Sequence, residues 1–335
     1  MNLHTLQDTA SALLAPGKGL LAADESLGTI GKRFAALGIE STPQTRRAYR
    51  EMLFGTPGIA NYLSGVILFD ETLRDDNGPS FPQMLEDQGI IPGIKVDEGA
   101  HDMAMFPGEK VTDGLDGLRD RLAQYGKLGA RFAKWRAVIT IGEGIPTYGC
   151  LRANAEALSR YAALCQEADI VPIVEPEVIM EGDHSIERCA AVTEETLRVT
   201  FAALVEARVA LEGVLLKPNM VLPGQDARAK TSVDEVARLT FQTLRRSVPA
   251  AVPGIVFLSG GQDDKAATAR LNAINSTGEP LPWTVTFSFA RALQNEAMET
   301  WGGKAENVAA AQEAFLHRLK LNSAAQRGEY GVEME

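Results

Sequence analysis

Short apolar runs alternate with longer stretches of helical periodicity along most of the chain. Eight runs have the composition of buried strands, and most of them lead into a polar or charged residue. They begin at Gly19 (GLLAADES), Gly65 (GVILFDET), Ile90 (IIPGIKVDEG), Ala133 (AKWRAVITI), Asp169 (DIVPIVEPE), Gly213 (GVLLKPNM), Gly254 (GIVFLSGG) and Trp283 (WTVTFSFAR). Strands that alternate with helices are parallel, because each return to the same edge of a sheet needs a long crossover.

The clearest helical patterns cover residues 152–168, 193–211, 232–247 and 263–275, and Ser232 and Asp263 are expected N-caps. Eight strand–helix units in a chain of 335 residues predict a (β/α)8 TIM barrel, in the α/β class. The alternative is an open doubly wound sheet. That fold usually has a glycine-rich phosphate turn after its first strand, and GLLAADES has none.

No Gly/Ser-rich or Pro-rich linker divides the chain. We therefore expect a single domain over residues 1–335, with an N-terminal helix and a short C-terminal tail from about residue 323 to 335.

The polar residues at the ends of the runs are expected to meet. The carboxyl ends of TIM-barrel strands form one face, where the active site lies. Lys217 follows the apolar residues 214–216, although a lysine is costly to desolvate there. Residues two apart share one face of a strand, which predicts a cavity lined by Asp24, Lys95, Lys134, Arg136, Glu175, Glu177, Lys217, Ser259 and Arg291.

Each of these charges also has a purely structural alternative. These are a helix cap for Asp24 and Ser26, solvated strand-edge charges for Lys134 and Arg136, solvated loop acids for Glu175 and Glu177, and a structural ion pair for Lys217. Such explanations would all have to hold at once in consecutive units, whereas a shared functional cavity explains them together.

The chemistry that fits two buried lysines is amine catalysis. A like-charged neighbour such as Lys134 reduces the preference of Lys217 for its charged form. A neutral amine attacks a ketone carbonyl, and the resulting iminium stabilises a carbanion at the adjacent carbon. Carboxylates at different depths then move protons on and off hydroxyl groups.

Anion binding is a second predicted property. The backbone N–H groups of Ser259, Gly260 and Gly261 precede a predicted helix and form a phosphate cradle, with Arg291 as its charged partner. A second cationic set, consisting of Arg33, Lys95 and Arg136, is placed to hold another anionic group.

The charge and the cysteine and histidine content of the chain disfavour several classes of binding partner and site. The chain has 33 Lys and Arg against 44 Asp and Glu, a net charge of −11, which disfavours nucleic acid and anionic membranes. The three cysteines form no CxxC pair, and no signal peptide or membrane span is seen, so we expect a reduced, intracellular setting. The four histidines lack ligand spacing, so no zinc site is expected.

Taken in order, these motifs resemble those of class I fructose-bisphosphate aldolases over nearly the whole chain. The motifs are LAADES (21–26), GVILFDETL (65–73), GIKVDEG (93–99), FAKWR (132–136), IVPIVEPE (170–177), EGVLLKPNM (212–220), FLSGGQ (257–262) and the RALQ of FSFARALQ (287–294).

The resemblance implies roles for individual residues. Lys217 matches the Schiff-base nucleophile, and Glu175 matches the general acid/base of carbinolamine formation and dehydration. Lys134 matches the lysine that assists this chemistry, with Glu177 in a supporting position. Asp24 matches the carboxylate that takes the C4 hydroxyl proton during cleavage.

The resemblance also implies how the two phosphates are bound. Ser259, Gly260 and Arg291 match the 1-phosphate site, and Gly261 and Ser288 are also expected to bind the substrate or its phosphates. The positions around the rest of the substrate, including the 6-phosphate, are Ser26, Thr29, Arg33, Arg46, Lys95 and Arg136.

The implied reaction is reversible cleavage of fructose 1,6-bisphosphate into dihydroxyacetone phosphate and glyceraldehyde 3-phosphate, without metal or cofactor, in a cytoplasmic homotetramer. Two alternatives are another Schiff-base barrel acting on monophosphorylated sugars and a protein that serves mainly as a binding scaffold. The chain departs from the family pattern at two places. Its last tyrosine is Tyr330, where eukaryotic members have a terminal tyrosine that assists enamine proton exchange, and Ala290 stands where glycine often precedes the arginine.

Overall fold

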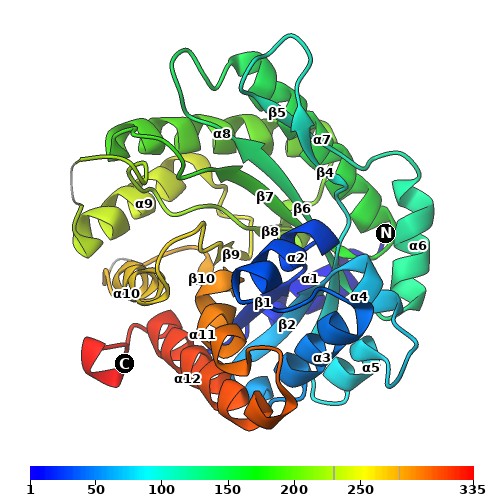
Figure 1. The fold of residues 1–335 in the computed structure, drawn as a ribbon. Helices are drawn as coiled ribbons and strands as arrows, with labels where there is room; N and C mark the ends of the chain where they lie inside the picture. Colours follow the sequence, from blue (N-terminus) through cyan, green and yellow to red (C-terminus); the bar gives the residue numbers. More distant parts are fainter. Residues whose placement is uncertain (229–230, 279) are drawn as a thin grey trace.

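The computed structural model describes residues 1–228, 231–278 and 280–335. Eight parallel strands close into a barrel in the order β1-β10-β9-β8-β7-β6-β3-β2 (Figure 1). They are β1 (Gly19–Ala23), β2 (Leu63–Leu68), β3 (Ile91–Lys95), β6 (Phe132–Ile139), β7 (Val171–Val178), β8 (Leu215–Leu216), β9 (Gly254–Phe257) and β10 (Thr284–Phe289). Each predicted run supplies one strand, so the (β/α)8 prediction is confirmed.

Most of the helices lie outside the barrel (Figure 1). Their bounds are α1 (Leu3–Leu13), α2 (Leu27–Ala36), α3 (Pro43–Phe54), α4 (Asp70–Arg74), α5 (Phe81–Glu86), α6 (Leu118–Lys127), α7 (Tyr148–Glu167), α8 (Ile186–Glu206), α9 (Val233–Ser247), α10 (Asp264–Asn275), α11 (Arg291–Trp301) and α12 (Val308–Gln326). The helices expected over 152–168, 193–211, 232–247 and 263–275 correspond to α7, α8, α9 and α10.

The expected N-caps are confirmed, while one helix end is wrong. Ser232 accepts a hydrogen bond from the Glu235 N–H, and Asp263 accepts one from the Ala266 N–H. The helix predicted to reach residue 211 ends at Glu206, because Arg208 adopts a left-handed backbone with a φ of 59°.

Some elements were not predicted from the sequence. A hairpin of β4 (Gly99–Asp102) and β5 (Lys110–Asp113) follows β3 and stands apart from the barrel sheet. The C-terminal end also differs in detail, since residues 323–326 belong to α12 and the segment after it begins at Arg327. No helix in the described part of the chain is long and apolar enough to cross a membrane.

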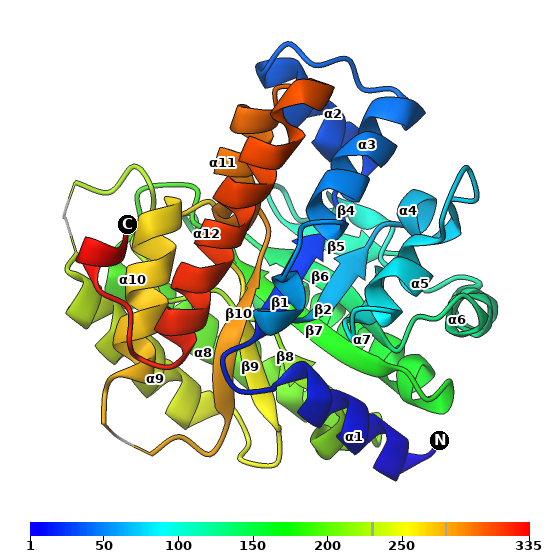
Figure 2. The same ribbon diagram turned by 90° about the horizontal axis from the view of Figure 1, so that it is seen from below.

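Helix α1 closes the amino-terminal end of the barrel and is the dark blue helix at the bottom of Figure 2. Its Leu6 and Leu13 are fully buried in one apolar cluster with Phe132, Ile173 and Leu215 of three barrel strands. Burying this end leaves the opposite end of the barrel available for polar side chains.

The ring of Phe132 occupies space that two neighbouring glycines leave free. A Cβ atom on Gly93 of β3 would overlap this ring, and one on Gly65 of β2 would lie 3.1 Å from it. Both positions therefore exclude larger residues for reasons of packing, since protein interiors leave few gaps.

We predict that Gly93→Ala lowers the free energy of unfolding by about 1–3 kcal/mol, because the added methyl group overpacks the barrel interior. Gly28→Ala is the matched control, since a Cβ there has no neighbour within 4 Å. Urea denaturation of both variants measures the difference. Equal stability of the two would contradict the packing argument.

Candidate active site

A cavity of about 1000 Å³ opens at the carboxyl ends of the barrel strands. It collects most of the residues that the sequence analysis placed there, which are Asp24, Ser26, Thr29, Arg33, Lys95, Lys134, Arg136, Glu175, Glu177, Lys217, Ser259, Gly260, Ser288 and Arg291. Two predicted residues, Gly261 and Arg46, do not line it.

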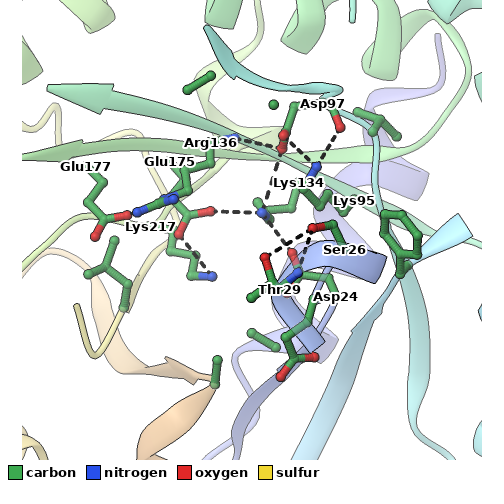
Figure 3. Close-up of a pocket in the computed structure, with 18 of the residues that line it drawn as sticks. Asp24, Ser26, Thr29, Lys95, Asp97, Lys134, Arg136, Glu175, Glu177 and Lys217 are labelled. Carbon is green, nitrogen blue, oxygen red and sulfur yellow. Dashed lines mark hydrogen bonds and ion pairs between the residues drawn. The ribbon is translucent and has the colours of Figure 1, made fainter. Parts of the chain in front are cut away.

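Lys217 lies immediately after β8, deep in this cavity. Its backbone N–H donates to the Val174 carbonyl oxygen of β7 at 2.9 Å, which continues the barrel pairing for one residue beyond the strand. The side chain is 5% exposed, and its Nζ lies 3.2 Å from Glu175 Oε1 (Figure 3). The lysine is therefore buried and, among the described residues, forms its ion pair with Glu175.

Lys134, on β6, is surrounded by three carboxylates. Its Nζ lies 2.8 Å from Asp24 Oδ2, 3.3 Å from Glu175 Oε2 and 3.7 Å from Asp97 Oδ2 (Figure 3). Burial alone would lower the pKa of Lys134, but the three negative charges outweigh it and raise that pKa well above its ordinary value. Lys134 thus carries a lasting positive charge near Glu175.

Asp24, directly after β1, is held in its ionised form. Burial opposes ionisation of its carboxyl group, but the charges of Lys134, Lys217 and Lys95 and the hydrogen bond from Lys134 lower its pKa to about 2. At neutral pH it is a carboxylate that faces the two buried lysines.

Glu177, two residues after Glu175 on β7, forms an ion pair with Nε of Arg136 on β6. The two glutamates point to the same side of β7, because they are two residues apart, but they have different partners. Glu175 faces the lysines, while Glu177 holds the arginine.

The loop after β9 forms one end of the cavity. Gly260 and Gly261 both adopt left-handed backbones, with φ values of 58° and 84°. A Cβ on Gly261 would lie 3.0 Å from Nη2 of Arg291, so this glycine leaves room for the guanidinium although it does not itself line the cavity. Ser288, at the end of β10, has a buried hydroxyl without a protein partner among the described residues.

Arg291 differs from the other guanidinium groups that line the cavity. Among the described residues it has no carboxylate partner, whereas Arg33 binds Glu25 and Arg136 binds Glu177. Its side chain is exposed at the first position of α11. In the described part of the chain, this end of the cavity therefore carries a positive charge that no ion pair offsets.

The opposite side of the cavity is formed by β3 and α2. Ser26 caps α2 and is hydrogen bonded to Thr29, and Lys95 ends β3. Arg46 was expected in this region but lies elsewhere: from α3 it forms two hydrogen bonds with Glu71 of α4, and it lines a separate pocket.

Four acidic residues that line the cavity were not predicted from the sequence, namely Glu25, Asp70, Asp97 and Glu98. Asp97 is 7% exposed and contacts Lys95 and Lys134, and Glu25 forms ion pairs with Arg33 and Arg50. A signal for Asp97 was present, since it lies two residues after Lys95 and so has the same parity.

Comparison with known proteins agrees with this geometry. A family model described as fructose-bisphosphate aldolase class-I, glycolytic, matches residues 5–335. This chain belongs to the class I fructose-bisphosphate aldolase family. The resemblance drawn from its motifs is thereby confirmed.

Individual relatives cover almost all of the chain. A protein of Xylella fastidiosa named probable fructose-bisphosphate aldolase class 1 is 54% identical over 98% of this chain and 99% of its own length. Fructose-bisphosphate aldolase 4, cytosolic, of Arabidopsis thaliana is 52% identical over 98% and 84%. A solved structure of the Plasmodium falciparum aldolase, in complex with TRAP and a small-molecule inhibitor, has a TM-score of 0.96 and 50% identity, covering 98% and 96%.

Two features of this member of the aldolase family concern its chemistry. The described residues contain no cluster of three or more His, Cys, Asp or Glu side chains able to hold a metal ion. The hydroxyl group of Tyr330 donates to Glu335 at 2.9 Å and does not line the cavity, so it is not at the lysines in this structure.

We predict a pH-dependent contribution of Asp24 to stability. Its pKa is about 2 in the folded protein against an ordinary value of 3.8, so from pH 6 to pH 3 the unfolded chain gains a proton that the folded one does not. This contribution is present above the unfolded pKa and decreases as the pH falls. Wild type should therefore lose about 1 kcal/mol more unfolding free energy than Asp24→Asn over this interval.

Urea denaturation at several pH values measures this difference. Parallel losses in the two proteins would contradict the assignment of Asp24 as an ionised partner of Lys134.

Proposed function

We propose that this chain catalyses the reversible aldol cleavage of fructose 1,6-bisphosphate through a Schiff base on Lys217. The observation that carries the proposal is the position of Glu175, which lies 3.2 Å from Nζ of Lys217 and 3.3 Å from Nζ of Lys134. One buried carboxylate can then exchange protons with the nucleophile while a fixed ammonium group holds it in place.

The first half of the proposed reaction forms the iminium. Lys217 transfers a proton to Glu175, and its neutral amine attacks the C2 ketone of the substrate. Glu175 returns the proton to the C2 oxygen, which gives the carbinolamine. It then carries a second proton from the nitrogen to the C2 hydroxyl group, which leaves as water. The iminium that results draws electrons from the C3–C4 bond.

The second half divides the carbon chain. Asp24 takes the proton of the C4 hydroxyl group, so that an aldehyde forms at C4 as the C3–C4 bond breaks and its electron pair enters the enamine. Protonation at C3 and addition of water then release dihydroxyacetone phosphate and regenerate the amine. The low pKa of Asp24 means that it enters this step as a carboxylate.

The proposed substrate has a phosphate at each end, and the cavity has cationic groups at two ends. Arg291 with the Ser259–Gly260 backbone supports a 1-phosphate site, with Ser288 nearby. Ser26, Thr29, Arg33, Lys95 and Arg136 support a 6-phosphate site. Two sites favour a bisphosphate over the monophosphorylated sugars of other lysine-dependent barrels.

The cellular context is part of the same proposal. Relatives named as cytosolic or cytoplasmic aldolases support a cytoplasmic enzyme. A homotetramer is expected from the family, and sedimentation analysis of the purified protein would measure the oligomeric state.

We predict that borohydride, added with dihydroxyacetone phosphate, reduces a Schiff base and attaches the ligand covalently to Lys217. Peptide mass spectrometry locates the adduct, and the Lys217→Arg variant is the matched control because it keeps the charge but cannot form the imine. EDTA should leave the yield unchanged. An active enzyme that carries no adduct at Lys217 would refute the mechanism.

We also predict that Arg291→Ala raises the KM for fructose 1,6-bisphosphate by about 10- to 100-fold, because a charge-assisted hydrogen bond to phosphate is worth about 1.5–3 kcal/mol. The exposed side chain makes little contribution to folding, so the thermal midpoint should stay close to that of wild type. Steady-state kinetics measure the effect. An unchanged KM would place the 1-phosphate elsewhere.

A further inference from the structure

We infer that Asp97 determines specificity for a second phosphate group by positioning Lys95. The inference rests on the proposed function, in which Lys95 contacts the 6-phosphate. Asp97 follows the end of β3, lines the same cavity, and has a side chain that is only 3% exposed. A buried carboxylate in such a place requires charged or hydrogen-bonded partners.

The nearest partner of Asp97 is Lys95. Nζ of Lys95 lies 2.6 Å from Oδ1 of Asp97 and donates to the backbone carbonyl oxygen of Asp97, also at 2.6 Å. An ammonium group has three donors, so two are held by one residue and the third is left for a ligand in the cavity. The long, flexible lysine side chain is thereby fixed before any ligand arrives.

The segment that carries Asp97 is itself held on both sides. The Val96 N–H donates to the Lys134 carbonyl oxygen at 3.1 Å, and Nη1 of Arg121 donates to the Val96 carbonyl oxygen at 2.8 Å. Oδ2 of Asp97 accepts a hydrogen bond from the Arg136 backbone N–H at 3.2 Å. These contacts fix the carboxylate relative to β6, so it can set the direction of Lys95.

The other ionic contact of Asp97 is weaker. Its Oδ2 lies 3.7 Å from Nζ of Lys134, which has closer partners in Asp24 at 2.8 Å and Glu175 at 3.3 Å. Removing the charge of Asp97 therefore leaves Lys134 with two carboxylates, while Lys95 loses its one carboxylate partner among the described residues. The effect should fall on the end of the substrate that Lys95 binds.

The test compares two substrates that differ in the second phosphate group. In Asp97→Asn, kcat/KM for fructose 1,6-bisphosphate should fall by about 10- to 100-fold, the equivalent of one charge-assisted contact. For fructose 1-phosphate it should change by less than about threefold, because no 6-phosphate is present. Rates are divided by the concentration of active sites, measured by borohydride trapping, so that unfolded protein is not counted.

A double-mutant cycle separates positioning from a general structural effect. If Asp97 acts through Lys95, adding Asp97→Asn to Lys95→Ala should cause no further loss of preference for the bisphosphate over fructose 1-phosphate. Asp102→Asn is the matched control, since this acid of β4 is 95% exposed and is not among the residues that line the cavity. It should stay within about twofold of wild type for both substrates.

Several results would overturn the inference. Equal losses for the two substrates would show a structural role, and independent effects in the cycle would show that Asp97 does not act through Lys95. A higher kcat/KM of Asp97→Asn for the bisphosphate would show that Asp97 competes with the phosphate for Lys95 and does not position Lys95 to bind it.

If Asp97→Asn does not fold, Asp97→Glu keeps the charge but moves it by one methylene group. It should show the same selective loss for the bisphosphate, and a uniform loss would again contradict the inference. The proposed function fails separately, since it requires the adduct on Lys217 whatever the behaviour of Asp97.

Discussion

The contact of one carboxylate, Glu175, with two buried lysines is the interaction on which the site depends. Its two oxygens face Lys217 and Lys134 from a side chain that is 4% exposed. The closed barrel makes this possible, because β7 pairs with β6 on one side and β8 on the other. Neither lysine is close to Glu175 in the sequence, so the arrangement exists only when the barrel is complete.

Most of the charged side chains that line the cavity are joined in ion pairs. Lys95 with Asp97, Lys134 with Asp24, Lys217 with Glu175, Arg136 with Glu177 and Arg33 with Glu25 each join a cation to an acid. Burying these charges is costly, and their mutual attraction offsets most of that cost while fixing their geometry. Among the described residues Arg291 has no carboxylate partner, so its positive charge at that end of the cavity is available to an anion.

The barrel and its central lysines were predictable because they depend on repeated local patterns. Apolar runs identified the strands, and parity along each strand identified the residues that meet at their ends. Asp97 was missed although it has the same parity as Lys95, because the pattern was followed only to the end of β3 and Asp97 lies two residues beyond it. Arg46 was misplaced because its direction depends on Glu71 of α4, a contact between two helices that neither periodicity nor composition reveals.

The two buried lysines differ in their ionic surroundings. Lys134 forms ion pairs with three carboxylates, whereas Lys217 has one ion-pair partner, Glu175, among the described residues. In the proposed mechanism Lys217 is the nucleophile and Lys134 is the ammonium group that holds Glu175 in place. The three carboxylates around Lys134 suit it to that part, because they favour its charged form and raise its pKa in spite of its burial.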